Sequence, residues 1–379
     1  MSAPVTGINR WWRHQTAISP VVEPWLHPGL ALPRLWAAHG DDSEAIVAFL
    51  GHHGLAGLWA GYLAGEEVAD EWRGLVAPLE QIRRGTLMLQ LLQEQAMTAV
   101  AAAFEAAGVN YVFLKTAGTR RELYDDPGTR PSTDIDILVE PEQRHHARAV
   151  IESLGGVAWA QQGESAHEIA FRLGSVDIDL HWDLLAPGRL RGEVAESILR
   201  RRVPARIGWR PDDTDVLFIQ LVHLAFAKHV CSPHAGLNRV TDTLLALRRL
   251  QPDQAMLEQR LRQAGCAHAA WASAYWIAML AAPIGEEGQA GVPPARSGGN
   301  EAVWLTELMR RLAPSSARSA YLRHWLINDW PGRLSGRHEW LVRMAFTLAL
   351  HDAFSDAARA TYRKLLRPNL AASASAAVA

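Results

Sequence analysis

The sequence predicts an α+β fold, in which a mixed β-sheet core with flanking helices follows an N-terminal helical segment and precedes a C-terminal helical lobe. Three observations support this prediction. Short apolar runs typical of strands lie between residues 110 and 181, a long amphipathic pattern precedes them, and helical patterns dominate after residue 188. A chain of 379 residues with 49% hydrophobic content can bury two or three modest cores.

Pattern and composition divide the chain into four expected parts. These are a helical lead-in over 1–78, an α/β core over 79–190, a helical lobe over 191–370 and a disordered Ala/Ser tail over 371–379. Inside the lobe, residues 285–300 are rich in Gly and Pro and are expected to form a loop.

The lead-in is expected to be helical but broken. Prolines interrupt the first 40 residues, which predicts an irregular segment or short helices. Asp42 is a candidate N-cap for a helix over residues 43–63, which three glycines weaken. From residue 79 to 107, apolar side chains recur at three- and four-residue steps. One long amphipathic helix is therefore expected there, ended by Gly108.

Two strands are predicted next in the core. The first, over residues 110–115, delivers Lys115 and a turn of small residues over 116–118 at its carboxyl end. The second covers residues 134–139, where apolar residues alternate with acids before becoming continuous. Both are short, as expected for strands of a small sheet.

A helix and a hairpin complete the predicted core. Pro141 opens the helix at a favoured first-turn position, and two glycines at 155–156 close it. Strands over 168–173 and 176–181 then flank Gly174-Ser175, a two-residue turn of the type that matches strand twist. Three or more strands therefore converge in one compact unit.

Composition narrows the class of protein and of partner. A formal net charge of -2 gives no overall attraction to nucleic acid or to a membrane. The two cysteines, Cys231 and Cys266, are too few for a disulfide framework and fit a reducing compartment. The sequence shows neither a secretory signal pattern nor an apolar run of roughly 18 residues. We therefore expect a cytoplasmic protein without a membrane partner.

Acids inside the apolar strands are the most informative feature. Strands disfavour Asp through both propensity and desolvation, and a bound cation offsets that cost. Asp134 and Asp136 are two apart on a strand, so their side chains leave one face with Cα atoms roughly 6.6 Å apart. Asp179, on the later hairpin, can reach the same cluster. For the Asp-x-Asp pair alone, a solvated edge strand is the alternative.

This acid pattern suits a divalent metal. Mg²⁺ prefers oxygen ligands and keeps positions open for water and substrate phosphates, and Mn²⁺ is an alternative ion. Two ions about 3.5–4 Å apart can stabilise both the attacking and the leaving oxygen in a phosphoryl or nucleotidyl transfer. A metal-dependent transferase is therefore expected.

Two cations and a glycine are candidate phosphate ligands. Lys115 at a strand end offers a point charge, Gly118 allows close backbone approach, and Arg130 could clamp a phosphate in bidentate fashion. The alternative is that Lys115 and Arg130 only balance the acids or face solvent.

The order of these motifs resembles the uncharacterised nucleotidyltransferase family, a branch of the polymerase-β-like superfamily. Members of that family read roughly Leu-Lys-Gly, Arg, Asp-Ile-Asp-Leu-Leu-Val and Asp-Leu-His-Trp. This chain carries Leu114-Lys115, Arg130, Asp134-Ile135-Asp136 and Asp179-Leu180-His181-Trp182. The resemblance is specific between about residues 110 and 183. It implies a minimal nucleotidyltransferase sheet with helices around it.

The resemblance also implies roles for individual residues. Asp134 and Asp136 would bind both ions, Asp179 would complete the site of the catalytic ion, and Lys115 would contact phosphate. One departure matters, because Thr116 stands where the family has a glycine. The phosphate approach expected of that turn would then shift to Gly118 or depend on the Thr116 hydroxyl.

Two further residues share the face of Asp179. Asp177 is the alternative third ligand, and Asp179 is preferred because it carries the Leu-His-Trp continuation. His181 could orient a carboxylate or act as a base, or it could be a satisfied, half-buried histidine.

The lobe offers further candidates around a buried helix. Residues 216–226 are apolar nearly all round, and His223 and Lys228 lie on or at the end of this helix, with Arg239 and Asp242 on the next. A basic helix end that lines a nucleotide cleft is the functional interpretation. The alternative is a helix terminus whose cations complement the macrodipole.

The expected function is Mg²⁺-dependent transfer of a nucleoside monophosphate from an NTP such as ATP, with release of pyrophosphate. The acceptor would be a hydroxyl or phosphate of a small molecule, peptide or protein, because near-neutral charge and the lack of an RNA-binding module disfavour long nucleic acid. One alternative is a nucleotide-sugar donor that glycosylates a modified peptide or metabolite. Another is a catalytically silent binding protein on the same fold.

Overall fold

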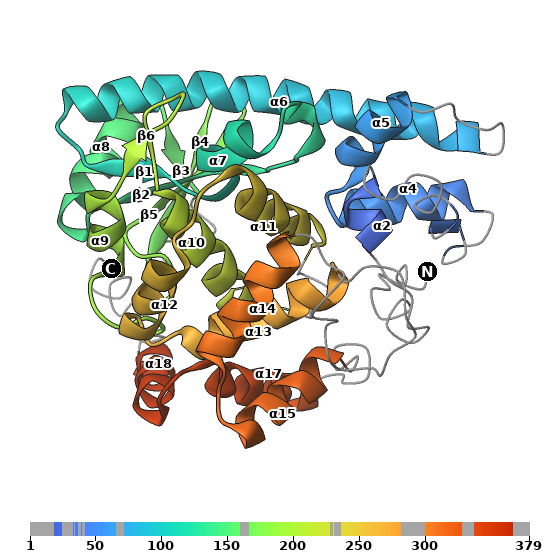
Figure 1. Ribbon diagram of the computed structural model, residues 1–379. Helices are drawn as coiled ribbons and strands as arrows, with labels where there is room; N and C mark the ends of the chain where they lie inside the picture. The colour runs from blue at the N-terminus through green and yellow to red at the C-terminus, as the bar shows by residue number, and fades with distance from the viewer. Residues whose placement is uncertain are drawn as a thin grey trace.

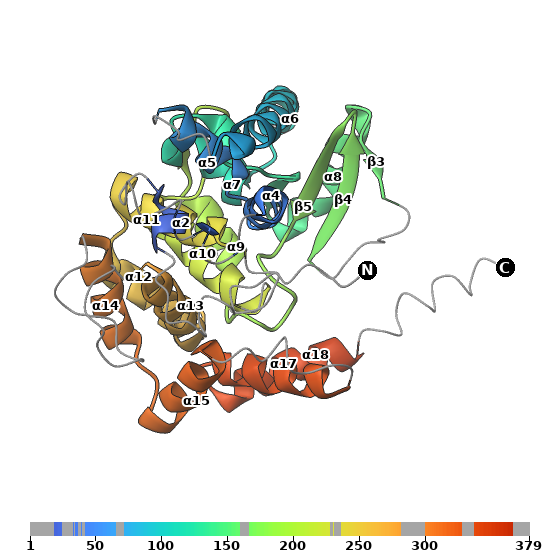
Figure 2. The ribbon, with the colours of Figure 1, turned by 90° about the vertical axis from the view of Figure 1, so that its right-hand side faces the viewer.

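Helices cover both faces of a five-stranded mixed sheet (Figures 1 and 2). The computed structural model describes residues 19–24, 33, 35–36, 39, 42–65, 72–159, 167–227, 230, 236–281, 300–327 and 337–366. The predicted tail over 371–379 and nearly all of the predicted loop over 285–300 lie outside these ranges. Within them, no helix is both long and apolar enough to cross a membrane.

The sheet joins one parallel pair to antiparallel neighbours. Its order is β1-β2-β5-β4-β3, and only β2 and β5 run parallel. The strands are β1 (Tyr111–Phe113), β2 (Asp134–Val139), β3 (Val157–Ala158), β4 (Glu168–Leu173) and β5 (Val176–His181). The mixed sheet and its flanking helices confirm the predicted fold class.

Strand alternation gives the sheet two different faces. Ile135 and Ile137 of β2, with Ile178 of β5, pack in one apolar cluster against α6 (Arg73–Ala106) and α8 (Arg144–Ser153). Because neighbouring side chains on a strand point to opposite faces, the aspartates of β2 and β5 face the other way. That second face is turned toward the C-terminal helices, which contribute to a separate apolar cluster.

The core hairpin follows the prediction, and the flanking helices differ from it in detail. β4 and β5 begin and end at the predicted residues, and Gly174 adopts φ +60 in their two-residue turn. Helix α6 starts at Arg73 rather than at residue 79, with Pro78 inside it. An interior proline removes one helical hydrogen bond, yet the helix continues through Pro78.

The predicted lead-in helix over 43–63 is two helices. Asp42 caps α4 (Ser43–His52) by accepting a hydrogen bond from the Ala45 amide at 2.9 Å, as expected. Gly54, at φ +66, lies between the end of α4 and the start of α5 (Ala56–Ala64). The left-handed backbone at this glycine separates two helices that the sequence pattern joined. A short helix, α2 (Ser19–Val22), precedes them.

The C-terminal lobe is helical, with one small hairpin at its entrance. β6 (Val203–Pro204) and β7 (Trp209–Arg210) form this hairpin, which the sequence did not predict. The lobe helices are α9 (Val194–Arg200), α10 (Asp213–Phe226), α11 (Asn238–Arg249), α12 (Gln254–Gln263), α13 (Ala267–Leu280), α14 (Asn300–Leu312), α15 (Ser316–Ile327), α17 (Arg337–Leu350) and α18 (Phe354–Leu366).

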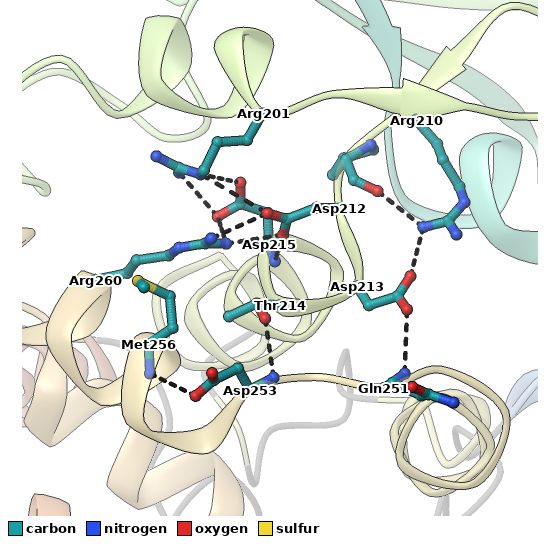
Figure 3. A network of polar contacts seen from close by, with 11 residues as sticks. Arg201, Arg210, Asp212, Asp213, Thr214, Asp215, Gln251, Asp253, Met256 and Arg260 are labelled. Carbon is teal, nitrogen blue, oxygen red and sulfur yellow. Dashed lines mark hydrogen bonds and ion pairs between the residues drawn. The ribbon is translucent and has the colours of Figure 1, made fainter.

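Four charged residues, here called the lobe clamp, join three of these helices (Figure 3). Arg201 follows α9, Asp212 caps α10, Asp215 lies in the first turn of α10, and Arg260 is on α12. Asp215 lies 2.9 Å from Arg201 Nε and 2.8 Å from Arg260, which also pairs with Asp212 at 2.8 Å. Each charge in the clamp therefore has an opposite partner.

Candidate active site

The parallel pairing of β2 with β5 brings the predicted acids to one place. Asp134 is in register with Asp177, and Asp136 is in register with Asp179. Asp134, Asp136 and Asp179, here called the acid row, leave the sheet on the face that is turned toward the lobe.

Asp136 lies at the centre of the acid row. It is 4% exposed, and its Oδ1 lies 2.5 Å from Lys115 Nζ and 2.9 Å from His181 Nε2. Burial alone would raise the pKa of Asp136, but the Lys115 charge and the His181 hydrogen bond outweigh burial and hold that pKa well below its ordinary value. Asp136 is therefore a stable carboxylate.

The other two acids are poorly compensated. Burial and the Asp136 charge raise the pKa of Asp134. Burial and the charges of Asp136 and Asp134 raise the pKa of Asp179 to about 6. Among the described residues, no lysine or arginine forms an ion pair with Asp134 or Asp179. Negative charge is thus concentrated on this face of the sheet.

This donor set fits a divalent cation. Single ligand atoms of Asp136, Asp179 and His181 all lie within 4.8 Å of one another. Carboxylate oxygens suit Mg²⁺ and Mn²⁺, and an imidazole is more usual for Mn²⁺ and heavier ions. Asp134, next to Asp136 on the same strand face, offers a further carboxylate. A bound cation would relieve the repulsion that raises the pKa of Asp179.

His181 lies between two carboxylates. It is 4% exposed, and its Nδ1 lies 3.1 Å from Glu168 Oε2 while Nε2 faces Asp136. Glu168 is not among the candidate residues predicted from the sequence. The signal was present, because the two-residue turn at 174–175 fixes the hairpin register and sets Glu168 opposite His181. Of the roles considered for His181, this geometry suits the orientation of a carboxylate.

Asp177 shares the strand face but has its own partner. Its carboxylate lies 2.9 Å from Arg172 Nε, and the Arg172 guanidinium stacks over the Trp159 ring. Asp177 is therefore neutralised at the outer part of the sheet, whereas Asp179 lies with Asp136 and His181.

Lys115 and the residues after it form a helix, so the predicted turn over 116–118 is wrong. Helix α7 (Lys115–Leu123) begins directly after β1, and Lys115 adopts φ +48 at the junction. Gly118 lies in the first turn of α7, where a Cβ would come within 2.1 Å of the Phe113 carbonyl oxygen. Its small size is thus needed to seat α7 on the strand. Thr116, half-buried, also lies in this first turn.

Arg130 is engaged elsewhere, in place of the expected phosphate clamp. Its guanidinium forms a bidentate pair with Asp242 of α11, with Nε–Oδ1 of 2.8 Å and Nη2–Oδ2 of 2.6 Å. The Tyr124 hydroxyl donates to the same carboxylate at 2.7 Å. This buried trio joins the sheet to the lobe.

The lobe candidates divide between the site and its surroundings. His223 of α10 lines a small, mostly apolar cavity together with Lys115 and His181. Lys228 lies outside the described residues. Arg239 of α11 is close enough to the acid row for Asp136 and Asp134 to raise its pKa, an effect that burial and Arg130 outweigh. The sequence predicted no separate role for Arg239, although this residue precedes Asp242 by three residues on the same helix.

Comparison with known proteins is consistent with this geometry. The model of a family described as uncharacterised nucleotidyltransferases matches residues 39–282, which include the acid row, Lys115 and the lobe helices as far as α13. Neither the curated proteins nor the solved structures contain a significant match. Since the family match covers well over half of the chain, this protein belongs to the uncharacterised nucleotidyltransferase family.

Proposed function

We propose that this protein transfers a nucleoside monophosphate from an NTP to an acceptor, with the help of a divalent cation held by the acid row. One observation carries the proposal. Asp136 and Asp179 lie side by side on parallel strands, with Asp134 next to Asp136. Of these three aspartates, only Asp136 forms an ion pair with a lysine or arginine among the described residues. Family membership supports nucleotidyl transfer as the reaction class.

Each residue has a part in this proposal. Asp134, Asp136 and Asp179 would hold Mg²⁺ or Mn²⁺, and His181, backed by Glu168, would fix the orientation of Asp136. The cation would supply charge stabilisation at the transferring phosphate. Lys115 would move its ammonium from Asp136 to a donor phosphate, since both groups are anionic and lie on the same side of the sheet.

The reaction is a substitution at the α-phosphorus of the donor. The acceptor oxygen forms a bond to phosphorus, and the bond from phosphorus to the bridging oxygen breaks to release pyrophosphate. Asp179, which lies with Asp136 at the cation site, would accept the proton that the acceptor hydroxyl loses.

A small molecule, peptide or protein in the cytoplasm is the acceptor that we propose. The formal net charge of -2 disfavours long nucleic acid. The two cysteines fit a reducing compartment.

The test is the thermal stability of the full chain with Mg²⁺ and each of the four NTPs, and with common nucleotide sugars. A ligand at about 100 times its Kd adds roughly 2.7 kcal/mol to the free energy of unfolding, which shifts Tm by several degrees. Asp136→Asn removes the central carboxylate. Asp125→Asn is the matched control, because the Asp125 side chain is 87% exposed and pairs with Arg249 at the surface, far from the acid row in its charge environment.

We expect a metal-dependent shift with an NTP that Asp136→Asn abolishes and Asp125→Asn retains. A shift with nucleotide sugars alone would contradict the NTP donor and favour glycosyl transfer. No shift with any donor would contradict the enzyme and favour a binding protein on this fold.

A further inference from the structure

Arg239 of helix α11 carries a guanidinium that lies near the acid row. Among the described residues, this guanidinium has no ion pair with a carboxylate. Arg239 is the second residue of α11, which packs against α7 (Figure 1). Its side chain is half-buried, and within the described parts of the chain it has neither an ion pair nor a hydrogen bond. This combination calls for an explanation, because buried charges are normally paired.

The position of Arg239 follows from its helix. Asp242 lies three residues further along α11, and residues at this spacing share one helix face. Asp242 holds Arg130, which precedes the first strand acid by only four residues. Arg239 therefore faces the start of β2, and the charges of Asp134 and Asp136 act on it. It lies across from the acid row without touching it.

Other arginines with buried or half-buried side chains have partners. Arg130 pairs with Asp242, Arg120 donates to the Gln93 side chain at 3.2 Å, and Arg189 donates to the Phe226 carbonyl at 2.7 Å. A guanidinium has five N–H donors in a planar fork. In Arg239 none of the five donates to another residue among those that the structure describes.

We propose that Arg239 binds a phosphate group of the donor, the role for which the sequence favoured Arg130. This inference rests on the proposed function, because it places the donor between the acid row and α11. The guanidinium fork matches two phosphate oxygens, whereas Lys115 on the opposite side offers a point charge. An anion between the acid row and α11 would be contacted by Arg239 of α11 and by Lys115 at the start of α7.

The test uses inorganic pyrophosphate with Mn²⁺ as the probe and the full chain as the protein. Calorimetry gives pyrophosphate affinity for wild type, Arg239→Gln, Arg239→Lys and Arg249→Gln. The last is a matched control on the same helix, since Arg249 pairs with the exposed Asp125. We expect about 10- to 100-fold weaker binding for Arg239→Gln, as for loss of hydrogen bonds to a charged group. Arg239→Lys should be intermediate, and Arg249→Gln should bind like wild type.

A second measurement separates anion binding from a structural role. Mn²⁺ affinity without pyrophosphate, followed by electron paramagnetic resonance, should be unchanged or higher in Arg239→Gln, because a repelling positive charge is gone. If Arg239→Gln binds pyrophosphate like wild type, or loses Mn²⁺ and pyrophosphate affinity together, the assignment of Arg239 is wrong. If wild type binds neither pyrophosphate nor any nucleotide, the proposed function fails and this inference fails with it.

Discussion

The acid row and the lobe clamp are two clusters of aspartates that are buried at their centres. The charges of the clamp are balanced, and those of the acid row are not. Asp136 is 4% exposed and Asp215 is 1% exposed, so burial is similar at their centres. In the clamp, Arg201 and Arg260 match two aspartates (Figure 3). In the acid row, the direct contacts of the three aspartates among the described residues include one ammonium, that of Lys115, and one imidazole, and Arg239 lies close by without an ion pair.

The pKa values of the two clusters reflect this balance. Burial lowers the pKa of Arg260, but Asp212 and Asp215 outweigh burial and raise it. Asp179 has no such partner within the described ranges, and burial together with the charges of its neighbours raises its pKa to about 6. Burial raises the pKa of Asp215 too, so even the clamp does not recover the whole cost of desolvation. A balanced cluster holds helices together, and an unbalanced one is prepared for a cation from outside.

Breaking the clamp should have the largest effect on stability. Asp215→Asn would leave Arg260 and the partly exposed Arg201 to share the single carboxylate of Asp212, which should lower the free energy of unfolding by about 3 kcal/mol. Urea unfolding measures this loss. Mn²⁺ affinity of the folded variant should match wild type, and a variant as stable as wild type would contradict the role of the clamp.

Removing the ammonium from the acid row should have a smaller effect. Of the described partners of the Asp136 carboxylate, Lys115→Met leaves His181, and we expect a loss of about 1–3 kcal/mol in the free energy of unfolding of metal-free protein. Mn²⁺ should bind more tightly to this variant, because no ammonium competes for Asp136 Oδ1. Urea unfolding with and without Mn²⁺ measures both effects, and weaker Mn²⁺ binding would argue against competition.

Neutralising Asp179 should increase the stability of the metal-free protein, in contrast to the two substitutions above. A carboxyl whose pKa is raised in the folded state stabilises the protein below its ordinary pKa of 3.8, and that stability is lost as pH rises through about 6. The side chain in Asp179→Asn cannot ionise. At pH 8 the free energy of unfolding of the metal-free variant should therefore exceed that of wild type by about 1 kcal/mol, because the repulsion between the carboxylates is relieved. Thermal melts from pH 4 to 8 test this. An advantage for the variant that is equally large at pH 4 would contradict the explanation.

An exposed ion pair should contribute least. Arg249 pairs with Asp125 at 2.7 Å, and the Asp125 side chain is 87% exposed. Arg249→Gln should change the free energy of unfolding by at most about 0.5 kcal/mol, because solvent and salt screen the pair. The same urea titration measures it. A loss comparable to that of Asp215→Asn would mean that burial does not distinguish these pairs.

Local patterns predicted the sheet that holds the acids. The hairpin could be predicted because Gly174-Ser175 defines a two-residue turn, and β2 could be predicted from its short apolar run. The start of α7 could not, because φ +48 at Lys115 and the close seating of Gly118 on Phe113 depend on tertiary contacts.

Partners distant in sequence account for the remaining differences at the site. Arg130 looked available beside the acids, but Asp242, 112 residues later, holds it. Nothing local to Arg130 indicates that partner, and nothing local to Arg239 indicates that its side chain is unpaired among the described residues. Sequence could identify the carboxylates because they disturb an apolar strand. It could not decide between two arginines that differ only in what folds against them.

The two-residue turn between β4 and β5 has a consequence for how this protein tolerates change. Because side chains alternate along a strand, adding or deleting one residue there could shift β5 by one position. Asp179 and His181 would then point into the layer of Ile and Phe side chains under α6 and α8, and Ile178 would replace them in the site. Insertions of one residue at this turn should therefore abolish folding and chemistry together.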